Sequence, residues 1–483
     1  MPRFARWKVF ILAASFVFYG AWDWRYTFLL AASIVGNQIF AVGIQRRIDE
    51  RGRKRWTAAA VATNLAVLGW FKYAGFLSDA GSGGLQWFGL DRELPVPDVL
   101  LPIGISFFTF QALSYVIDVS RRKIHPVKLI DFAVYLSFFP HLVAGPIVRA
   151  SEFLPQLRER RDPRQVQTTL ALWLIAAGLV KKVVVASYLA DRVVDPLFAV
   201  PAEHGGIEAL VGVYAYAIQI YADFSGYTDM AIGLALLLGF QFPQNFDAPY
   251  TAASLQDFWR RWHMTLSRWL RDYLYVGLGG NRGARWHTYF NLVLTMVLGG
   301  LWHGAAWTFV VWGLLHGCGL AVERYLGERR LRRAGSAAAP PDTDVLAAAP
   351  GAGYGTVLVE AEPEVVLEPL PPPATSIWVR RLVTFHFVCL GWIFFRSETI
   401  DDAFGIIGRI LGGGGATPLN PVVVLVVALM LASQFVPAAR VSRIRERVGT
   451  WSLPVQAAAL AGVIVAVDVL GPSGIAPFIY FQF

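Results

Sequence analysis

Two histidines in unusual settings are the first candidates for chemistry. His303 lies in GGLWHGAAW, between a short apolar run and a longer one, with small residues around it. Small neighbours allow helices to pack closely and leave room for a ligand. A neutral imidazole in such a place can take a proton from an attacking hydroxyl as a general base. A histidine hydrogen-bonded between two helices would give the same pattern, so the motif alone leaves both interpretations open.

The second histidine, His263, lies in FWRRWHMTLSRWL, where arginines and tryptophans interleave. Guanidinium groups form strong hydrogen bonds with phosphates. This segment can therefore face a phosphate-bearing donor such as coenzyme A. The candidate donor-binding residues are Arg260, Arg261, Arg268 and Arg271. The alternative is an amphipathic helix whose arginines reach anionic lipid headgroups.

The segment ADFSGYTD at 222–229 is polar inside an otherwise apolar stretch. Carboxylates at membrane depth are functional candidates, so these side chains can line a cavity. The alternative is a hydrogen-bonded break in a helix. Among recognisable motifs, no Gly-rich phosphate loop, paired HxxxH or CxxC occurs, and the only two cysteines, Cys318 and Cys389, are isolated. The sequence predicts neither a disulfide nor a metal site.

Long apolar runs must position these residues. Only 16% of the 483 residues are charged and 55% are hydrophobic, whereas a soluble domain has about 25% charged residues. Many runs approach the ~20 helical residues that cross a bilayer. We therefore predict an all-α, polytopic membrane protein. Basic cytoplasmic loops explain the net charge of +9 better than nucleic-acid binding does.

Hydropathy predicts about 11 spans, and the basic loops orient them. Loops at 45–56 and 440–447 are rich in arginine and are expected in the cytoplasm. The N-terminus is then cytoplasmic and the C-terminus lies outside. The predicted apolar helices cover about 8–21, 25–45, 57–77, 99–119, 168–189, 207–239, 288–299, 304–325, 382–396, 419–436 and 453–471.

Several segments depart from simple spans. Pro140 and Gly145-Pro146 interrupt residues 129–147, which predicts a re-entrant segment beside a wet interior. The run at 288–299 is interrupted by Gly299-Gly300 and reaches only part way across the membrane at ~1.5 Å per residue. Within 241–287, LQDFWRRWHMTLSRWLRDYLY predicts an interfacial helix anchored by tryptophans.

Composition also divides the chain into three parts. Ala, Pro, Gly and Glu dominate residues 334–376, which predicts a disordered cytoplasmic linker. This linker separates a membrane core at 1–333 from C-terminal spans and an outer tail at 377–483. We expect the candidate histidines to lie in the core.

Several blocks, arranged in a characteristic order, resemble the membrane-bound O-acyltransferase (MBOAT) family. They are LPIGISFFTFQALSYVIDV, FFPHLVAGPIVR, YADFSGYTDMAIGLALLLGF, NFDAPYTAASLQDFWRRWHMTLSRWLRDYLYVGLGGNR and GLWHGAAWTFVVWGLLHG. The most similar branch is the alginate O-acetyltransferase type, which includes peptidoglycan O-acetylation subunits and relatives of the teichoic-acid D-alanyl transfer protein. The linker at 334–376 is not part of the family pattern.

The resemblance implies roles for particular residues. The invariant catalytic histidine of the family matches His303, and its second functional histidine matches His263. The family fold is a ring of tilted helices around a thin centre, where a funnel brings a cytoplasmic acyl donor to an outer acceptor. The ending PFIYFQF fits the F-x-Y-x-x-F pattern of this branch, in which the tyrosine, here Tyr480, is proposed to carry the acyl group. The alternative is an aromatic anchor for the last helix.

The resulting hypothesis is a cytoplasmic (inner) membrane O-acetyltransferase. Acetyl-coenzyme A is the expected donor, with no bound cofactor and no nucleic-acid partner. An extracytoplasmic partner enzyme is expected to acetylate an exported polysaccharide such as alginate. One competing hypothesis is a transporter or channel, because broken helices with polar residues at membrane depth also mark transport pathways. Another is a structural scaffold of an export complex, in which both histidines would be replaceable.

Overall fold

The computed structural model describes residues 2–90, 92–95, 100–159, 163–333, 376–413 and 419–471. All regular structure in these residues is helical, as predicted, and none of them forms a strand. The chain divides into two compact units. The first comprises residues 1–166 and 235–242, and the second comprises residues 167–234 and 243–483.

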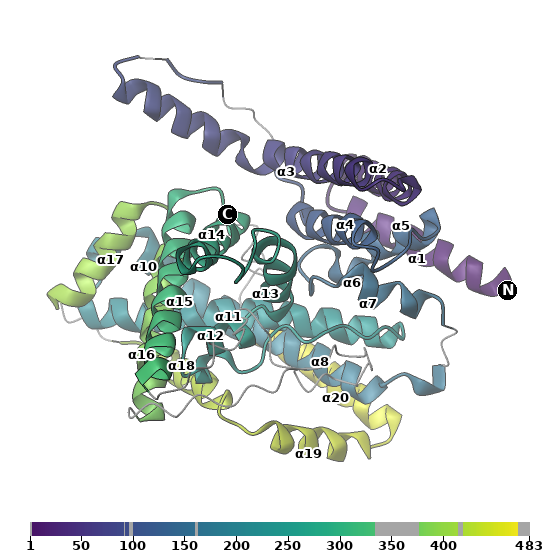
Figure 1. Cartoon of the computed structure of the whole chain (residues 1–483). Helices are drawn as coiled ribbons and strands as arrows, with labels where there is room; N and C mark the ends of the chain where they lie inside the picture. The colour runs from purple at the N-terminus through teal and green to yellow at the C-terminus, as the bar shows by residue number, and fades with distance from the viewer. Residues whose placement is uncertain are drawn as a thin grey trace. The chain divides into compact units, whose positions relative to one another are not determined.

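The first unit contains the N-terminal helices (Figure 1). Its α2, α3 and α4 pack against one another, and α5 packs against α1 and α2. Its elements are α1 (Pro2–Gly20), α2 (Arg25–Arg46), α3 (Glu50–Trp87), α4 (Ile105–Ser120), α5 (Leu129–Ser137), α6 (Phe139–Leu142), α7 (Ala150–Phe153), η1 (Pro155–Leu157) and η2 (Pro163–Gln165).

The helix is interrupted in the segment 129–147, where the sequence predicts a re-entrant segment. The helix α5 ends at Ser137, and the single-turn α6 begins beyond Phe138 with Pro140 in its first turn. The chain is then non-helical through Gly145-Pro146. The predicted break in 129–147 is therefore confirmed. It occurs because proline lacks the N–H that would continue the helix.

The second unit holds both candidate histidines. Its first elements are α8 (Thr168–Leu179), η3 (Val180–Ala186), α9 (Ser187–Leu189), η4 (Ala190–Val194), α10 (Asp195–Ala199), η5 (Pro201–Glu203), α11 (Gly206–Leu237), η6 (Pro249–Thr251), α12 (Leu255–Arg261) and α13 (Met264–Trp269). They are followed by η7 (Leu270–Tyr275), α14 (Arg285–His303), α15 (Trp307–Arg333), α16 (Ile377–Arg396), α17 (Ile400–Gly412), α18 (Pro421–Ser433), α19 (Ala438–Gly449) and α20 (Leu453–Leu470).

Three described helical stretches are long and apolar enough to cross a membrane: Arg25–Arg46, Thr168–Ala199 and Ile377–Arg396. A fourth candidate arises if α18 and α19, bent by 96°, count as one broken span. The chain is thus a helical membrane protein, but the predicted count of about 11 spans is not confirmed. Several other apolar runs form shorter helices, such as the 16-residue α4.

One predicted helix break is wrong, because α14 continues through Gly299-Gly300 to His303. These glycines do not end the helix. A side chain at Gly300 would overlap the backbone of Phe309 on α15, and one at Gly313 would lie 2.7 Å from Cα of Val297 on α14. Glycine therefore allows α14 and α15 to pack backbone against backbone, which brings the end of α14 beside α15 (Figure 1).

The alternative of a helix break at the polar segment 222–229 is wrong, because α11 runs through this segment without a break. Its carboxylates form ion pairs with lysines of the π-helical η3. Lys181 lies 2.6 Å from Asp229 and donates to the Ser225 hydroxyl at 3.0 Å, and Lys182 pairs with Asp223. A π-helical turn is a rare structure that often accompanies a functional or strained site.

Candidate active site

His263 lies at a sharp turn between α12 and α13. Its φ of 42° and ψ of 52° place it in the left-handed region, which costs a non-glycine residue about 1–3 kcal/mol. The predicted single interfacial helix is therefore wrong: α12, α13 and the π-helical η7 replace it. The break turns the imidazole inward, where it is fully buried. The strained backbone is therefore that of His263 itself, and it sets the position of the imidazole.

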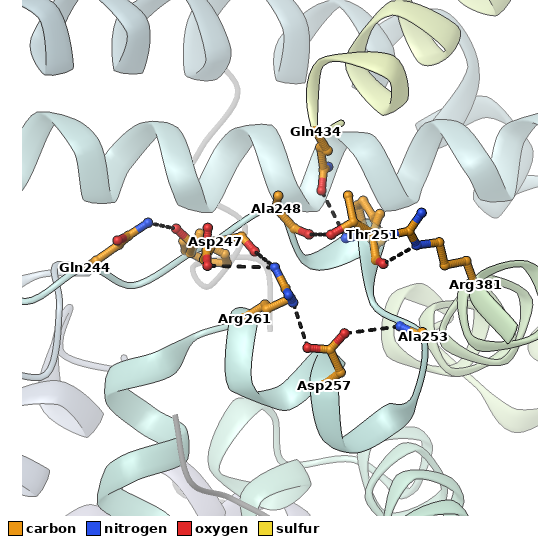
Figure 2. Close-up of polar contacts among 11 residues, drawn as sticks. Gln244, Asp247, Ala248, Thr251, Ala253, Asp257, Arg261, Arg381 and Gln434 are labelled. Carbon is orange, nitrogen blue, oxygen red and sulfur yellow. Dashed lines mark hydrogen bonds and ion pairs between the residues drawn. The ribbon is translucent and has the colours of Figure 1, made fainter. Parts of the chain in front are cut away.

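Two backbone hydrogen bonds hold this turn against the preceding loop. The N–H of Asp247 donates to the carbonyl of Arg261 at 2.9 Å, and the N–H of Met264 donates to the carbonyl of Asn245 at 2.9 Å. Arg261 also donates from Nε to Asp257 at 2.7 Å and from Nη1 to the Asp247 carbonyl at 3.3 Å (Figure 2). The guanidinium thus ties α12 to the loop.

More distant segments fix the same loop at η6. The amide oxygen of Gln434, at the end of α18, accepts from the N–H of Tyr250 at 2.9 Å. Arg381 of α16 donates to the Thr251 carbonyl at 2.9 Å (Figure 2). Because C-terminal helices supply these contacts, the residues after 376 help to position the turn at His263.

Asn245 sets the protonation of the His263 ring. Its Oδ1 accepts from the backbone N–H of Thr265 at 3.1 Å and from the Thr265 hydroxyl at 2.9 Å. The same oxygen lies 3.2 Å from Nδ1 of His263, so Nδ1 carries the proton and donates. Burial lowers the pKa of His263 to about 3. The ring is therefore neutral near pH 7, and the lone pair of Nε2 is available as an acceptor.

His303 is the last residue of α14 and lies next to His263. The two ring centres are 6.4 Å apart, and His303 is almost completely buried. The rings of Trp312 on α15 and Phe395 on α16 each lie 5.2 Å from the His303 ring. The structure thus brings the two sequence-predicted histidines together in one buried cluster, built by the α12–α13 turn and the end of α14.

A group of buried polar atoms adjoins this pair. Trp312 contacts His316 at 4.9 Å and Trp259 at 5.7 Å between ring centres. Within the described part of the chain, no hydrogen-bond partner reaches the indole nitrogens of Trp259 and Trp312, either nitrogen of His316, or Nε2 of His263. Each unsatisfied buried polar group costs about 1–3 kcal/mol. Bound water or a polar substrate would satisfy them, which suits a reaction site.

The four predicted arginines have different surroundings, although all are half-buried. Arg261 and Arg271 form ion pairs with Asp257 and Asp272 at 2.7 and 2.5 Å. Their charge is thus largely balanced within the protein. Arg260 and Arg268 lie on α12 and α13, on either side of His263 in the sequence. Tyr480 lies outside the described residues.

Sequence reasoning missed three residues of this site. Asn245 opens the block NFDAPYTAASLQDFWRRWH, but nothing in the pattern showed that its side chain would return to His263. His316 and Trp312 lie on α15, the helix after His303, and no motif indicates that either is a site residue. The available signal was their polar ring nitrogens inside an apolar helix, which must find partners when buried.

Comparisons with known proteins agree on one family. Residues 53–333 match the sequence profile of the membrane-bound O-acyltransferase family. The chain is 39% identical to the "probable alginate O-acetylase AlgI" of Azotobacter vinelandii, over 86% of this chain and 74% of that protein. It is 42% identical to the protein of that name from Pseudomonas aeruginosa, over 82% and 68%. It is 34% identical to the "peptidoglycan O-acetyltransferase" of Helicobacter pylori, over 85% and 75%.

Proposed function

The chain belongs to the membrane-bound O-acyltransferase family, and we propose that it supplies acetyl groups for the O-acetylation of an exported polysaccharide. It is an O-acyltransferase by family. The acetyl group and the polymer class rest on relatives named for the O-acetylation of alginate or peptidoglycan. The structural observation that carries the proposal is the buried pair His263–His303, with ring centres 6.4 Å apart.

The proposed reaction is acyl transfer from a thioester to a hydroxyl. The neutral imidazole of His303 takes the hydroxyl proton while the oxygen attacks the thioester carbonyl. The tetrahedral intermediate then collapses, the carbon–sulfur bond breaks, and the imidazolium returns its proton to the thiolate. His303 ends neutral, so the cycle needs no other proton source. In this mechanism the single proton of the hydroxyl goes to His303, and Nε2 of His263 accepts a hydrogen bond from a second donor, such as an N–H of the pantetheine arm of the acyl donor, without becoming charged.

The proposal places the donor on the cytoplasmic side. Acetyl-coenzyme A would enter beside the half-buried arginines around His263, whose guanidinium groups suit its phosphates: Arg260, Arg261, Arg268 and Arg271. The finer architecture is part of the same proposal: about 11 spans in an inner membrane surround a funnel, with the N-terminus in the cytoplasm and the C-terminus outside. Such a funnel solves a physical problem, because coenzyme A is too polar to cross the membrane.

Tyr480 is the proposed covalent carrier on the outer side. Its phenolic oxygen would accept the acetyl group as an ester and pass it to an extracytoplasmic partner enzyme. We expect that the purified full-length protein, in lipid nanodiscs with isotope-labelled acetyl-coenzyme A, gains one acetyl group on its C-terminal peptide. Mass spectrometry of the intact chain and its peptides measures the label. The variant Tyr480→Phe is expected to remain unlabelled there.

The possible outcomes separate the carrier from the function. Label on another residue would remove Tyr480 from the mechanism and leave acyl transfer in place. A wild-type protein that stays unlabelled would contradict the carrier step. If the polymer of the native cell remained fully acetylated after deletion of this protein, the O-acetylation function would be wrong. A transporter would move a solute and form no acetyl ester in any variant.

Asn245→Ala is expected to lower the rate of acetyl transfer by about 10- to 100-fold, because the supporting contact of a site residue is lost. The variant removes the acceptor that fixes the His263 tautomer. The matched control is Thr265→Val, which removes a hydroxyl from the same oxygen but leaves the contact between Asn245 and His263. Initial rates at saturating and limiting donor measure both variants. Equal losses in the two variants would show that Asn245 acts only through the stability of the turn.

A further inference from the structure

None of the residues of the helix α19 (Ala438–Gly449) is buried, although Ser442, Arg445 and Val448 are half-buried and the helix packs against α8. Three apolar residues lie on one face of it, spaced three and four residues apart: Val441, Ile444 and Val448. The exposed fractions of Val441 and Ile444 are 36% and 51%. An apolar stripe on a soluble surface would be unfavourable, so this face requires a partner.

Arginines border the stripe on both sides. Arg440, Arg443 and Arg447 follow one another at helical spacing along one edge, and all three are exposed. Arg445 lies at the other edge, and Glu446 is the only acidic residue of the helix. In the described part of the chain, none of these four arginines forms an ion pair with a carboxylate. No carboxylate of the described residues therefore balances their positive charge in an ion pair.

The neighbouring helices fix how α19 lies relative to an apolar layer. The apolar α18 precedes it and is bent away from it by 96°, and the apolar α20 follows. Two exposed aromatic residues, Phe435 and Trp451, flank α19 at its two ends. If α18 and α20 occupy the apolar layer, α19 runs along its surface, and aromatic residues at both ends suit the headgroup level.

We propose that α19 is a binding surface for the headgroups of anionic phospholipids. A row of positive charges beside a bilayer attracts anionic headgroups, by about 1 kcal/mol for each Arg or Lys near the surface. The adjacent apolar stripe requires that the same ligand also provides hydrocarbon. A lipid with an anionic headgroup provides both, whereas a free nucleotide or an acidic polysaccharide provides only the charge. Helices with this pattern bind in the interface plane and favour anionic lipids.

The test places a reporter on the stripe of the full-length protein. Ile444→Cys is made in a Cys318→Ser background, because Cys318 is exposed and Cys389 is buried. The cysteine is labelled with a small fluorophore, and the protein is placed in nanodiscs whose phosphatidylcholine carries a nitroxide in the acyl chain. The fraction of phosphatidylglycerol is then varied. We expect quenching to rise with this fraction, because the anionic headgroups draw the stripe into the bilayer.

Charge variants decide whether the arginines cause this effect. With Arg440, Arg443, Arg445 and Arg447 all changed to Gln, half-maximal quenching should need at least about ten-fold more phosphatidylglycerol, since each juxtamembrane arginine is worth roughly five-fold in affinity. The same four positions changed to Lys are the matched control and should stay within about three-fold of the parent. Because α19 has no buried residue, these changes remove no buried side chain. The midpoint of thermal unfolding of each variant checks that the packing of α19 against α8 is kept.

Three results would overturn the proposal. The first is a reporter that stays unquenched in every disc. The second is equal quenching in pure phosphatidylcholine and in discs rich in phosphatidylglycerol, which would mean apolar insertion without headgroup recognition. The third is loss of the lipid dependence in millimolar inorganic phosphate at constant ionic strength, which would identify a site for soluble phosphate.

Discussion

His303→Ala is expected to reduce acetyl transfer by about two to four orders of magnitude, the usual contribution of a general base. The imidazole is almost completely buried beside His263, so bulk water cannot readily take over the proton transfer. The neighbouring rings of Trp312 and Phe395 hold its position from two other helices. The measurement is the initial rate of acetyl transfer by the purified protein, with folding checked by size-exclusion chromatography.

Two further variants make this result specific. His303→Gln keeps a polar side chain of similar size, but glutamine cannot act as a base near pH 7. Its rate of acetyl transfer should therefore fall as much as that of His303→Ala. The control is His287→Ala, which removes a solvent-exposed histidine from the same helix α14 and should leave the rate unchanged. A His303→Gln protein that retained more than about a tenth of the rate would place the base on another residue.

The sequence predicted the helical class and the two histidines because both leave local signals. Apolar runs identify helices whatever their packing, and His263 and His303 lie in blocks long enough to resemble a family. The sequence did not predict that the two histidines lie next to each other. No spacing rule relates residues 40 positions apart, because the distance between two helices depends on how both pack.

The features that the sequence did not predict depend on tertiary contacts. The sequence predicts a helix end at Gly299-Gly300, since glycine lowers the stability of a helix. In the structure, close packing of α14 on α15 outweighs this destabilisation, and the helix continues to His303. The left-handed turn at His263 is unfavourable locally and persists because hydrogen bonds of Asn245 and Arg261 hold it against the preceding loop. The count of about 11 spans is not confirmed, because hydropathy registers composition, whereas two apolar runs in the described residues form helices of only 10–17 residues, Ile105–Ser120 and Leu453–Val469.

The ion pair between Lys182 and Asp223 has the largest expected effect on stability. Both side chains are more than nine-tenths buried, and they join η3, which lies in the candidate span Thr168–Ala199, to α11. Removing the lysine takes the opposite charge away from a buried carboxylate, and breaking a buried ion pair in this way typically costs about 3–5 kcal/mol of unfolding free energy. We therefore expect Lys182→Met to lower the stability of the purified protein sharply, measured as the midpoint of thermal unfolding at fixed detergent or lipid composition.

A double-mutant cycle isolates the pair from the other contacts of each residue. Lys182→Met combined with Asp223→Leu removes both charges and should recover most of the stability, because apolar side chains of similar volume often replace a buried ion pair without loss. The matched control is Lys181→Met, whose partner Asp229 is about one-fifth exposed and can be solvated when the lysine is absent. Lys181→Met should lower the free energy of unfolding by about 1 kcal/mol, since a partly exposed ion pair contributes less to stability. If the double variant lost as much unfolding free energy as the sum of the two single variants, the two charges would not be coupled. The close backbone contact of Gly178 on α8 with Gly226 on α11 would then be what joins these helices.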